Sequence, residues 1–263
     1  MKRLLAIMLL CGTIAARGDE WQKTLTPQEP GAFPALRPLH ATYRFGWTKF
    51  PAATADFDYT KTKDGLMKLD VQTSTDGFVR GLWSMDATHT SLFDPATLKP
   101  VSAIQTEIYK KETLTTKLDF DAEGVSRLRE AKPPDKNPPK TKRFKFPGVL
   151  DLYGALLFVR SQPLQKGDTV RVVVYPTTDP YLAEVKVRDR EKVEAGKKTY
   201  DAIKLEVKLR RITKKLELEP HASFKKATAW LSDDRDRLLL RIQAEVSVGS
   251  VWTELEAVKF GEP

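Results

Sequence analysis

Alternation of apolar and polar residues is the feature of this sequence that most restricts its fold. It is clearest at 39–47, where the apolar positions are Leu39, Ala41, Tyr43, Phe45 and Trp47. A two-residue period places such side chains on one face of a β-strand. Parallel strands, which are buried on both faces, would instead be apolar at almost every position. The pattern therefore predicts antiparallel strands with one face in water.

The same period returns along the rest of the chain, at 53–59, 67–71, 203–209, 238–248 and 251–257. Turn-forming sequences rich in Gly and Asp separate these runs. A set of roughly a dozen candidate strands favours a curled sheet over a flat one. We predict a mainly β fold in which 39–260 forms one domain, as a single large curled antiparallel sheet or an open β-barrel.

One stretch departs from this period. Pro147-Gly148 precedes an apolar run that stops before Pro163, with Asp151 near its start and Arg160 near its end. A helix with charges placed in this way complements its own dipole. Because the run is apolar on nearly all sides, the helix must be buried. We predict a short helix inside the curled sheet, and a second short helix near Phe78–Trp83.

The amino terminus is typical of a secretory signal peptide. Two basic residues precede an apolar run of about 13 residues, which is shorter than the ~20 that a transmembrane helix needs. We predict that residues 1–18 are removed and that the protein is exported to the periplasm or envelope. An alternative is lipoprotein anchoring through Cys11, the single cysteine, although Leu10 before it fits such a cleavage site poorly.

Two segments are rich in proline. Residues 19–38 hold four prolines and little apolar periodicity, which predicts an extended arm. Residues 131–140 hold four prolines and three lysines. Proline removes ladder donors and like charges repel, so this second segment is predicted to be an exposed loop.

Composition restricts the partners more than it identifies them. The 263 residues include 44 Lys and Arg against 35 Asp and Glu, a formal charge of +9. The basic pairs are scattered, which disfavours nucleic acid, whereas a weak attraction to anionic lipid or polysaccharide is plausible. The sequence contains no glycine-rich phosphate loop, nucleophile elbow or paired-histidine zinc helix, so we expect no cofactor.

Few residues suggest chemistry. The three histidines, His40, His89 and His221, are far apart in the sequence. Aspartates cluster at 56/58, 119/121 and 233–236, and Asp233 and Asp234 are the weak candidates for a metal site. The ordinary alternative is that aspartates in turns accept local backbone hydrogen bonds.

Candidate ligand-binding residues follow from the predicted interior. Asp151 and Arg160 could orient a polar group of a ligand, and Tyr43, Trp47 and Trp230 could line an apolar cavity. The alternatives are helix ends that reach water or pair with the sheet, and aromatic side chains that simply pack in the core.

Several groups of residues resemble a known bacterial family. They are Tyr43-x-Phe45-x-Trp47, Phe146-Pro147, Asp151-Leu152, Ala155-Leu156-x-Phe158-x-Arg160, Gly167-Asp168, Tyr200-Asp201-Ala202-Ile203-Lys204-Leu205, Trp230-Leu231-Ser232-Asp233-Asp234 and Val248-Gly249-Ser250. Over 38–258 the chain resembles the secreted family called domain of unknown function 3108. The resemblance implies an envelope protein with a curved antiparallel sheet and no established activity. The chain departs from the family at Phe50-Pro51-Ala52-Ala53, where a glycine usually re-enters the second strand.

We therefore expect a non-catalytic envelope protein that binds a hydrophobic or amphipathic ligand, or that serves as an interaction scaffold. The interior of a curled sheet must be filled either by side chains or by a ligand. The alternative is a carboxylate-dependent envelope hydrolase acting on a glycan or another polymer, which needs two acidic groups roughly 5–10 Å apart across a cleft. Oligomeric state and ligand identity stay open at this point.

Overall fold

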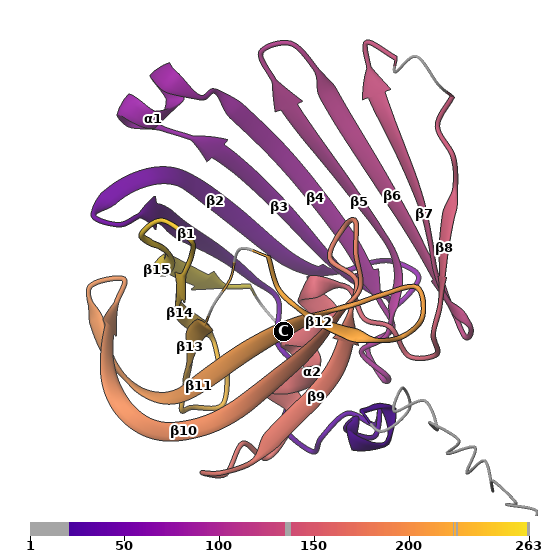
Figure 1. Ribbon diagram of the computed structural model, residues 1–263. Coiled ribbons are helices and arrows are strands. Elements are labelled where there is room, and N and C mark those ends of the chain that lie inside the picture. The colour runs from indigo at the N-terminus through magenta and orange to yellow at the C-terminus, as the bar shows by residue number, and fades with distance from the viewer. Residues whose placement is uncertain (1–20, 135–137, 223, 225, 262–263) are drawn as a thin grey trace, which may run out of the picture.

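The computed structural model describes residues 21–134, 138–222, 224 and 226–261, and one antiparallel sheet dominates it (Figure 1). The first strands are β1 (Leu39–Trp47), β2 (Phe50–Lys61), β3 (Met67–Thr75), β4 (Met85–Phe93), β5 (Pro100–Tyr109), β6 (Thr113–Asp121), β7 (Gly124–Lys132) and β8 (Lys142–Lys145). The later strands are β9 (Thr169–Val174), β10 (Tyr181–Ala195), β11 (Lys198–Ile212), β12 (Leu218–Pro220), β13 (Lys226–Ser232), β14 (Leu239–Glu245) and β15 (Ser250–Phe260). The helices are η1 (Gln22–Thr24, a 3-10 turn), α1 (Gly77–Leu82) and α2 (Leu152–Ser161).

The strands pair in the order β8-β7-β6-β5-β4-β3-β2-β1-β15-β14-β13-β11-β10-β9, and β12 pairs with β11. Strand β1 lies between β2 and β15, so the two ends of the β-rich region are neighbours in the centre of the sheet. This arrangement confirms the prediction of a mainly β fold with one large antiparallel sheet. The alternation in the sequence is thus the alternation between the inner and outer faces of the curl.

The sheet curls without closing into a barrel. Its edge strands, β8 and β9, do not pair with each other. Instead, the segment after β8 runs beside β9: Leu150 N donates to Val173 O at 2.9 Å, and Tyr175 N donates to Leu150 O at 2.8 Å. These bonds form an isolated parallel bridge between Leu150 and Val174. The two edges are therefore brought together by the chain that leads into α2.

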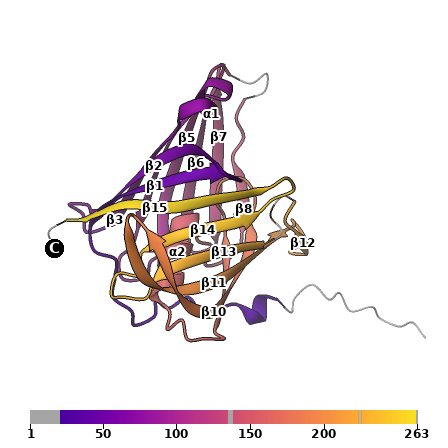
Figure 2. The ribbon, with the colours of Figure 1, turned by 90° about the vertical axis from the view of Figure 1, so that its left-hand side faces the viewer.

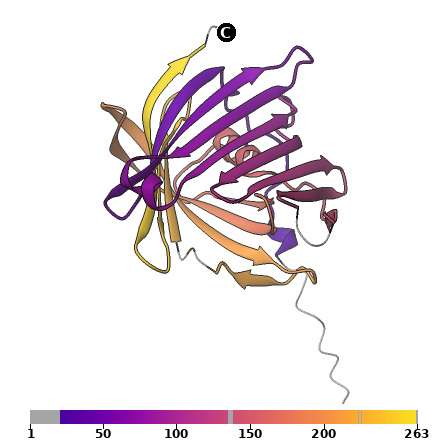
Figure 3. The same ribbon diagram turned by 90° about the horizontal axis from the view of Figure 1, so that it is seen from above.

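Helix α2 lies inside the curl, as the view from above shows (Figure 3). Seven of its ten residues are buried, which confirms the predicted buried helix. Leu157 packs in a cluster with β1–β4, whereas Phe158 and Val159 pack in a second cluster with β9–β11 and β13. A third cluster, which includes Val149 and Tyr175, fills the junction of the two sheet edges.

The segment before β1 packs onto this junction and onto the end of α2. The Trp21 ring stacks on Phe146 with centroids 5.5 Å apart, and its Nε1 donates to Leu216 O at 2.8 Å. Gly31 approaches the carbonyl of Ser161 so closely that a Cβ atom would stand 2.1 Å from that oxygen. Only glycine fits at this contact. The predicted signal peptide at 1–18, with Cys11, lies outside the described residues.

Four of the connections at the opposite end of the sheet form a surface that we call the rim. They are the β14–β15 turn (246–249), the β1–β2 turn (48–49), the β3–β4 connection with α1 (76–84) and the β5–β6 turn (110–112). Antiparallel pairing places them at one end. Figure 2 shows α1 well apart from α2. Helix α1 agrees with the helix predicted near Phe78–Trp83. In the described parts of the chain, no helix has the length and apolar character needed to cross a membrane.

The predicted proline-lysine loop at 131–140 follows β7 at the rim end. Residues 131 and 132 still belong to β7, and 135–137 lie outside the described residues.

Candidate functional site around the enclosed helix

Asp151 begins α2 and is the most buried of the predicted site residues, with 0% of its surface exposed. Its Oδ1 accepts a hydrogen bond from Gly154 N at 2.7 Å, which is an N-cap. Its Oδ2 accepts one from the Ser91 hydroxyl at 2.6 Å. Burial raises the pKa of Asp151 to about 6, although these hydrogen bonds act in the opposite direction. The carboxyl group is therefore held in place at the centre of the fold.

A chain of buried polar groups continues from Asp151 along the inner face of the sheet. His89 Nε2 lies 2.7 Å from Ser91 Oγ, and its Nδ1 lies 3.4 Å from Gln105 Oε1. The His89 ring also packs edge-on against Tyr153 of α2, with centroids 4.8 Å apart. Because the Ser91 hydroxyl donates to Asp151, its oxygen must accept from His89.

This polarity is opposite to that of a nucleophilic serine, whose hydroxyl donates to the histidine base. Ser91 is also 0% exposed. Serine, histidine and aspartate are thus adjacent here, but they form a buried structural network without the arrangement of an acyl-transfer site.

Arg160 occupies the other end of α2, so the helix keeps it apart from Asp151. Its guanidinium donates to Pro34 O and Asp236 O, both at 2.9 Å, and burial lowers its pKa to about 10. The Asp236 carboxylate in turn accepts two bonds from Arg37, each of 2.9 Å. The predicted pair of ligand-orienting charges is therefore engaged by the protein itself.

Arg237 closes the carboxyl end of α2. It donates to the carbonyls of Arg160 (2.6 Å), Gln162 and Pro163 (3.0 Å), and its guanidinium lies 3.5 Å from the centre of the Phe33 ring. Carbonyls at a helix end lack partners within the helix, and a cation there is favourable. Nothing in the local sequence identifies this role, because Arg237 comes from a turn far along the chain.

The three aromatic candidates separate into two environments. Tyr43 and Trp230 belong to the same apolar cluster as Leu157. The Tyr43 hydroxyl donates to Leu239 O at 2.8 Å, and Trp230 Nε1 donates to Glu191 at 2.6 Å. Burial raises the pKa of Tyr43 well above its usual value. Both side chains pack in the core.

Trp47, in contrast, lies at the rim with 47% of its surface exposed.

The weak metal candidates have other partners. Asp233 accepts from Arg190 Nε at 2.6 Å, and Asp234 Oδ1 accepts from Ser232 and from the backbone of its own turn. Within the described ranges, no three His, Cys, Asp or Glu residues gather closely enough to hold one metal ion. The cluster at 233–236 thus forms a turn tied by an ion pair.

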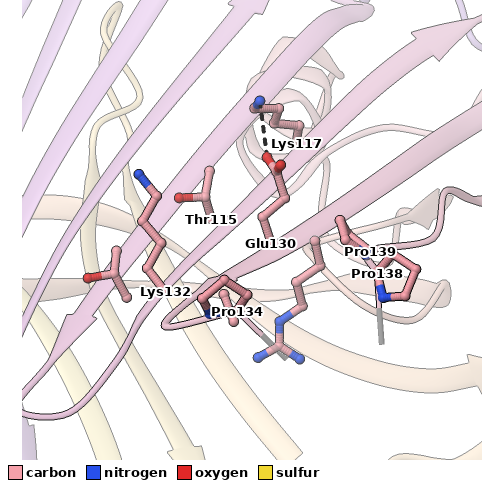
Figure 4. A pocket seen from close by; sticks show the side chains of 10 residues that line it. Thr115, Lys117, Glu130, Lys132, Pro134, Pro138 and Pro139 are labelled. Atoms are coloured by element: carbon pink, nitrogen blue, oxygen red, sulfur yellow. Dashed lines mark ion pairs between the residues drawn. The ribbon is translucent and has the colours of Figure 1, made fainter. Parts of the chain in front are cut away.

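Two open hollows in the described residues lie away from α2. One of about 490 Å³ lies beside β6, β7 and Pro134, and contains the 3.2 Å ion pair between Lys117 and Glu130 (Figure 4). A second, of about 380 Å³, lies at the rim beside Trp83 and Tyr109. Asp151 and Arg160 line neither of them.

Sequence reasoning missed His89, Ser91 and Arg237. The first two could have been found from the alternation of β4, because they share a face with the fully buried Phe93. An inward-facing histidine and serine on one strand predict a buried hydrogen-bond network.

Comparison with one solved structure supports the fold, and two others match more weakly. A β-barrel-like protein of domain of unknown function DUF1849 from Brucella abortus has a TM-score of 0.59 and 10% identity, over 88% of this chain and 100% of its own. A candidate lipoprotein from Parabacteroides distasonis has a TM-score of 0.34 and 9% identity, over 89% and 100% of the two chains. A candidate exported protein with a YmcC-like fold from Bacteroides fragilis has a TM-score of 0.33 and 10% identity, over 88% and 99%. No curated protein matches the sequence.

Residues 42–256 match the family described as "Protein of unknown function (DUF3108)". This range extends from the first strand to the last and includes α2, Asp151 with its partner Ser91, and Arg237. The chain therefore belongs to the DUF3108 family.

Proposed function

We propose that this protein is a non-catalytic component of the bacterial cell envelope that acts through its surface, as an interaction module, and holds no ligand in its interior. The observation that carries the proposal is the filling of the curl by α2. Seven of its ten residues are buried, and its two ends are fixed by separate polar networks. The predicted signal peptide at 1–18 supports export.

A protein that carries a ligand inside a curled sheet needs an interior that is empty until the ligand enters. Here Leu157, Phe158 and Val159 project from α2 into two apolar clusters, each at most 6% exposed. The aromatic residues Tyr43 and Trp230 complete the packing. These contacts favour the interaction module over the carrier.

The hydrolase alternative receives less support. Its two carboxylates must face each other across a cleft that admits water and substrate. Asp151 is fully buried and accepts two hydrogen bonds, while Asp233 is paired with Arg190.

Native mass spectrometry of the protein purified from envelope extracts tests the proposal. We expect the mass of the mature chain without a bound lipid, and no displacement of a fluorescent fatty acid. A fatty-acid carrier protein measured in the same assays serves as the positive control. A stoichiometric lipid on the wild-type protein would show that it is a carrier. Cell fractionation of the full chain and of a variant without residues 1–18 tests export. We expect the full chain in the envelope fraction and the shortened variant in the cytoplasm.

A further inference from the structure

The large apolar side chains that the fold leaves in water gather at the rim. Seven of the eleven exposed ones in the described residues lie there: Phe78 (82% exposed), Leu82 (71%), Val248 (70%), Phe50 (65%), Trp83 (53%), Trp47 (47%) and Ile108 (47%). They come from all four rim connections or the strand residues beside them. An exposed apolar group of this extent marks an interaction surface.

Helix α1 shows most clearly that this exposure is built into the fold. None of its residues is buried. Polar contacts hold it instead: Thr54 donates to Asp76 at 2.8 Å, and Arg80 donates to both carboxylate oxygens of Asp86, at 2.8 and 3.0 Å. These contacts position α1 so that Phe78 and Leu82 point into water.

Hydrogen bonds and ring contacts join the rim connections in two pairs. Trp47 Nε1 donates to Val248 O at 2.9 Å, which links the β1–β2 turn to the β14–β15 turn. Trp252 Nε1 adds a second link to Thr48 O at 3.0 Å. The Trp83 ring stacks on Tyr109 at 6.2 Å, which connects α1 to β5. Figures 1 and 3 both show α1 and the two turns on one side of the molecule. The exposed side chains therefore belong to one supported surface.

Basic residues flank this surface. Lys49, Lys110 and Lys111 are exposed, and none has an ion pair in the described part of the chain. Arg80 is neutralised by Asp86 at 2.8 Å. The nearby exposed acidic groups are Glu112 and Glu245. Aromatic side chains next to lysines are typical of surfaces that bind at the boundary between lipid headgroups and acyl chains.

We propose that the rim docks on a lipid bilayer that contains anionic lipids. Phe78, Leu82 and Phe50 enter the headgroup region, to a depth of about 5–10 Å, while the lysines remain at the level of the phosphates. The inference rests on the proposed function, because it names the partner of the interaction module. The projecting turns of the rim suit a deformable lipid surface better than the fixed shape of a protein groove.

Vesicle co-sedimentation tests this docking. The vesicles are phosphatidylcholine alone or with about one quarter phosphatidylglycerol, since anionic lipid attracts lysines near a surface. We expect Phe78→Ser with Leu82→Ser to reduce the partition coefficient on both vesicles by about tenfold or more. Lys110→Gln with Lys111→Gln should reduce it by up to about tenfold, on anionic vesicles alone.

The matched control is Val101→Ser with Leu152→Ser. These side chains are 42% and 52% exposed but lie away from the rim, so binding should stay as in the wild type. Unchanged binding of the rim variant, or equal loss in both variants, would overturn the proposal. The proposal would also be wrong if the wild-type protein did not bind vesicles but formed a dimer that the rim variant could not form. The rim would then bind a second copy of the chain. A lipid found inside the protein would overturn the proposed function while the vesicle results for the rim still held.

Discussion

The two short helices of this protein, α1 and α2, have similar apolar sequences and opposite environments. Helix α2 has seven buried residues out of ten, whereas α1 has none. The difference comes from what each helix connects. Helix α1 joins β3 and β4, which are neighbours, so it remains at the end of the sheet. Helix α2 joins β8 and β9, the two free edges, so the curl of the sheet encloses it.

Apolar composition therefore does not decide burial in this fold. The region around α2, which we call the enclosed end, is stabilised by packing of the helix and by hydrogen bonds to its two termini. The rim is shaped by hydrogen bonds and an ion pair, and it leaves its aromatic side chains free for contact. Four sets of substitutions test this difference between the two helices.

Removing a side chain from the buried face of α2 should be the most destructive change. Phe158 is 2% exposed. We expect Phe158→Ala to lower the free energy of unfolding by about 3–5 kcal/mol, because it loses apolar burial and leaves a cavity. Urea denaturation measures this value. Leu152→Ala, at a position of the same helix that is 52% exposed, is the control and should cost much less.

The buried carboxyl group of Asp151 should make the free energy of unfolding depend on pH. The folded protein raises the pKa of Asp151 from 3.8 to about 6, so it binds this proton more tightly than the unfolded chain does. The resulting stabilisation is complete below about pH 4 and is lost as the pH rises through about 6. Over this range we expect the unfolding free energy of the wild type to fall relative to Asp151→Asn by up to roughly 3 kcal/mol.

The difference between the wild type and Asp151→Asn isolates the contribution of the Asp151 carboxyl group to the pH dependence of stability. Burial lowers the pKa of His89, which makes stability rise with pH in an overlapping range, but His89 is present in both proteins. Asparagine retains an oxygen that can cap Gly154. Denaturation curves at several pH values measure the difference, and a constant gap between the two proteins would contradict the assignment.

The carboxyl end of α2 should depend on Arg237. Arg237→Met leaves the carbonyls of Arg160, Gln162 and Pro163 without their side-chain donor. We expect a loss of about 2 kcal/mol, since the buried carbonyl of Arg160 would lose its partner and an unsatisfied buried carbonyl is costly. Arg235→Met changes an exposed arginine of the same turn and should be nearly neutral. Equal losses of unfolding free energy in both variants would show that Arg237 does not stabilise the protein by capping α2.

The rim should tolerate substitutions that the enclosed end does not. Phe78→Ser with Leu82→Ser should change the free energy of unfolding by less than about 0.5 kcal/mol, because no residue of α1 is buried. Thermal or urea denaturation gives the value. A loss similar to that of Phe158→Ala would mean that α1 packs in the core of the protein in solution.

Much of the fold could be predicted because its signals are local. The period of two located β1–β3, β11, β14 and β15, and the Pro147-Gly148 and Pro163 boundaries located α2, with Asp151 at its start. The function of Asp151 could not be predicted in the same way. Its partner Ser91 is 60 positions away, and only the register of β4 brings the two together.

A curled antiparallel sheet around a buried helix follows from local patterns, because periodicity depends on residues within a few positions of each other. The remaining features depend on contacts between distant segments. The sequence left open whether side chains or a ligand fill the curl, which arginine caps α2, and which aromatic residues remain in water. Arg237 reaches Arg160 across 77 positions, and the exposure of Trp47 depends on where its turn lies in the sheet. Such contacts follow from strand order and curvature, which no local pattern encodes.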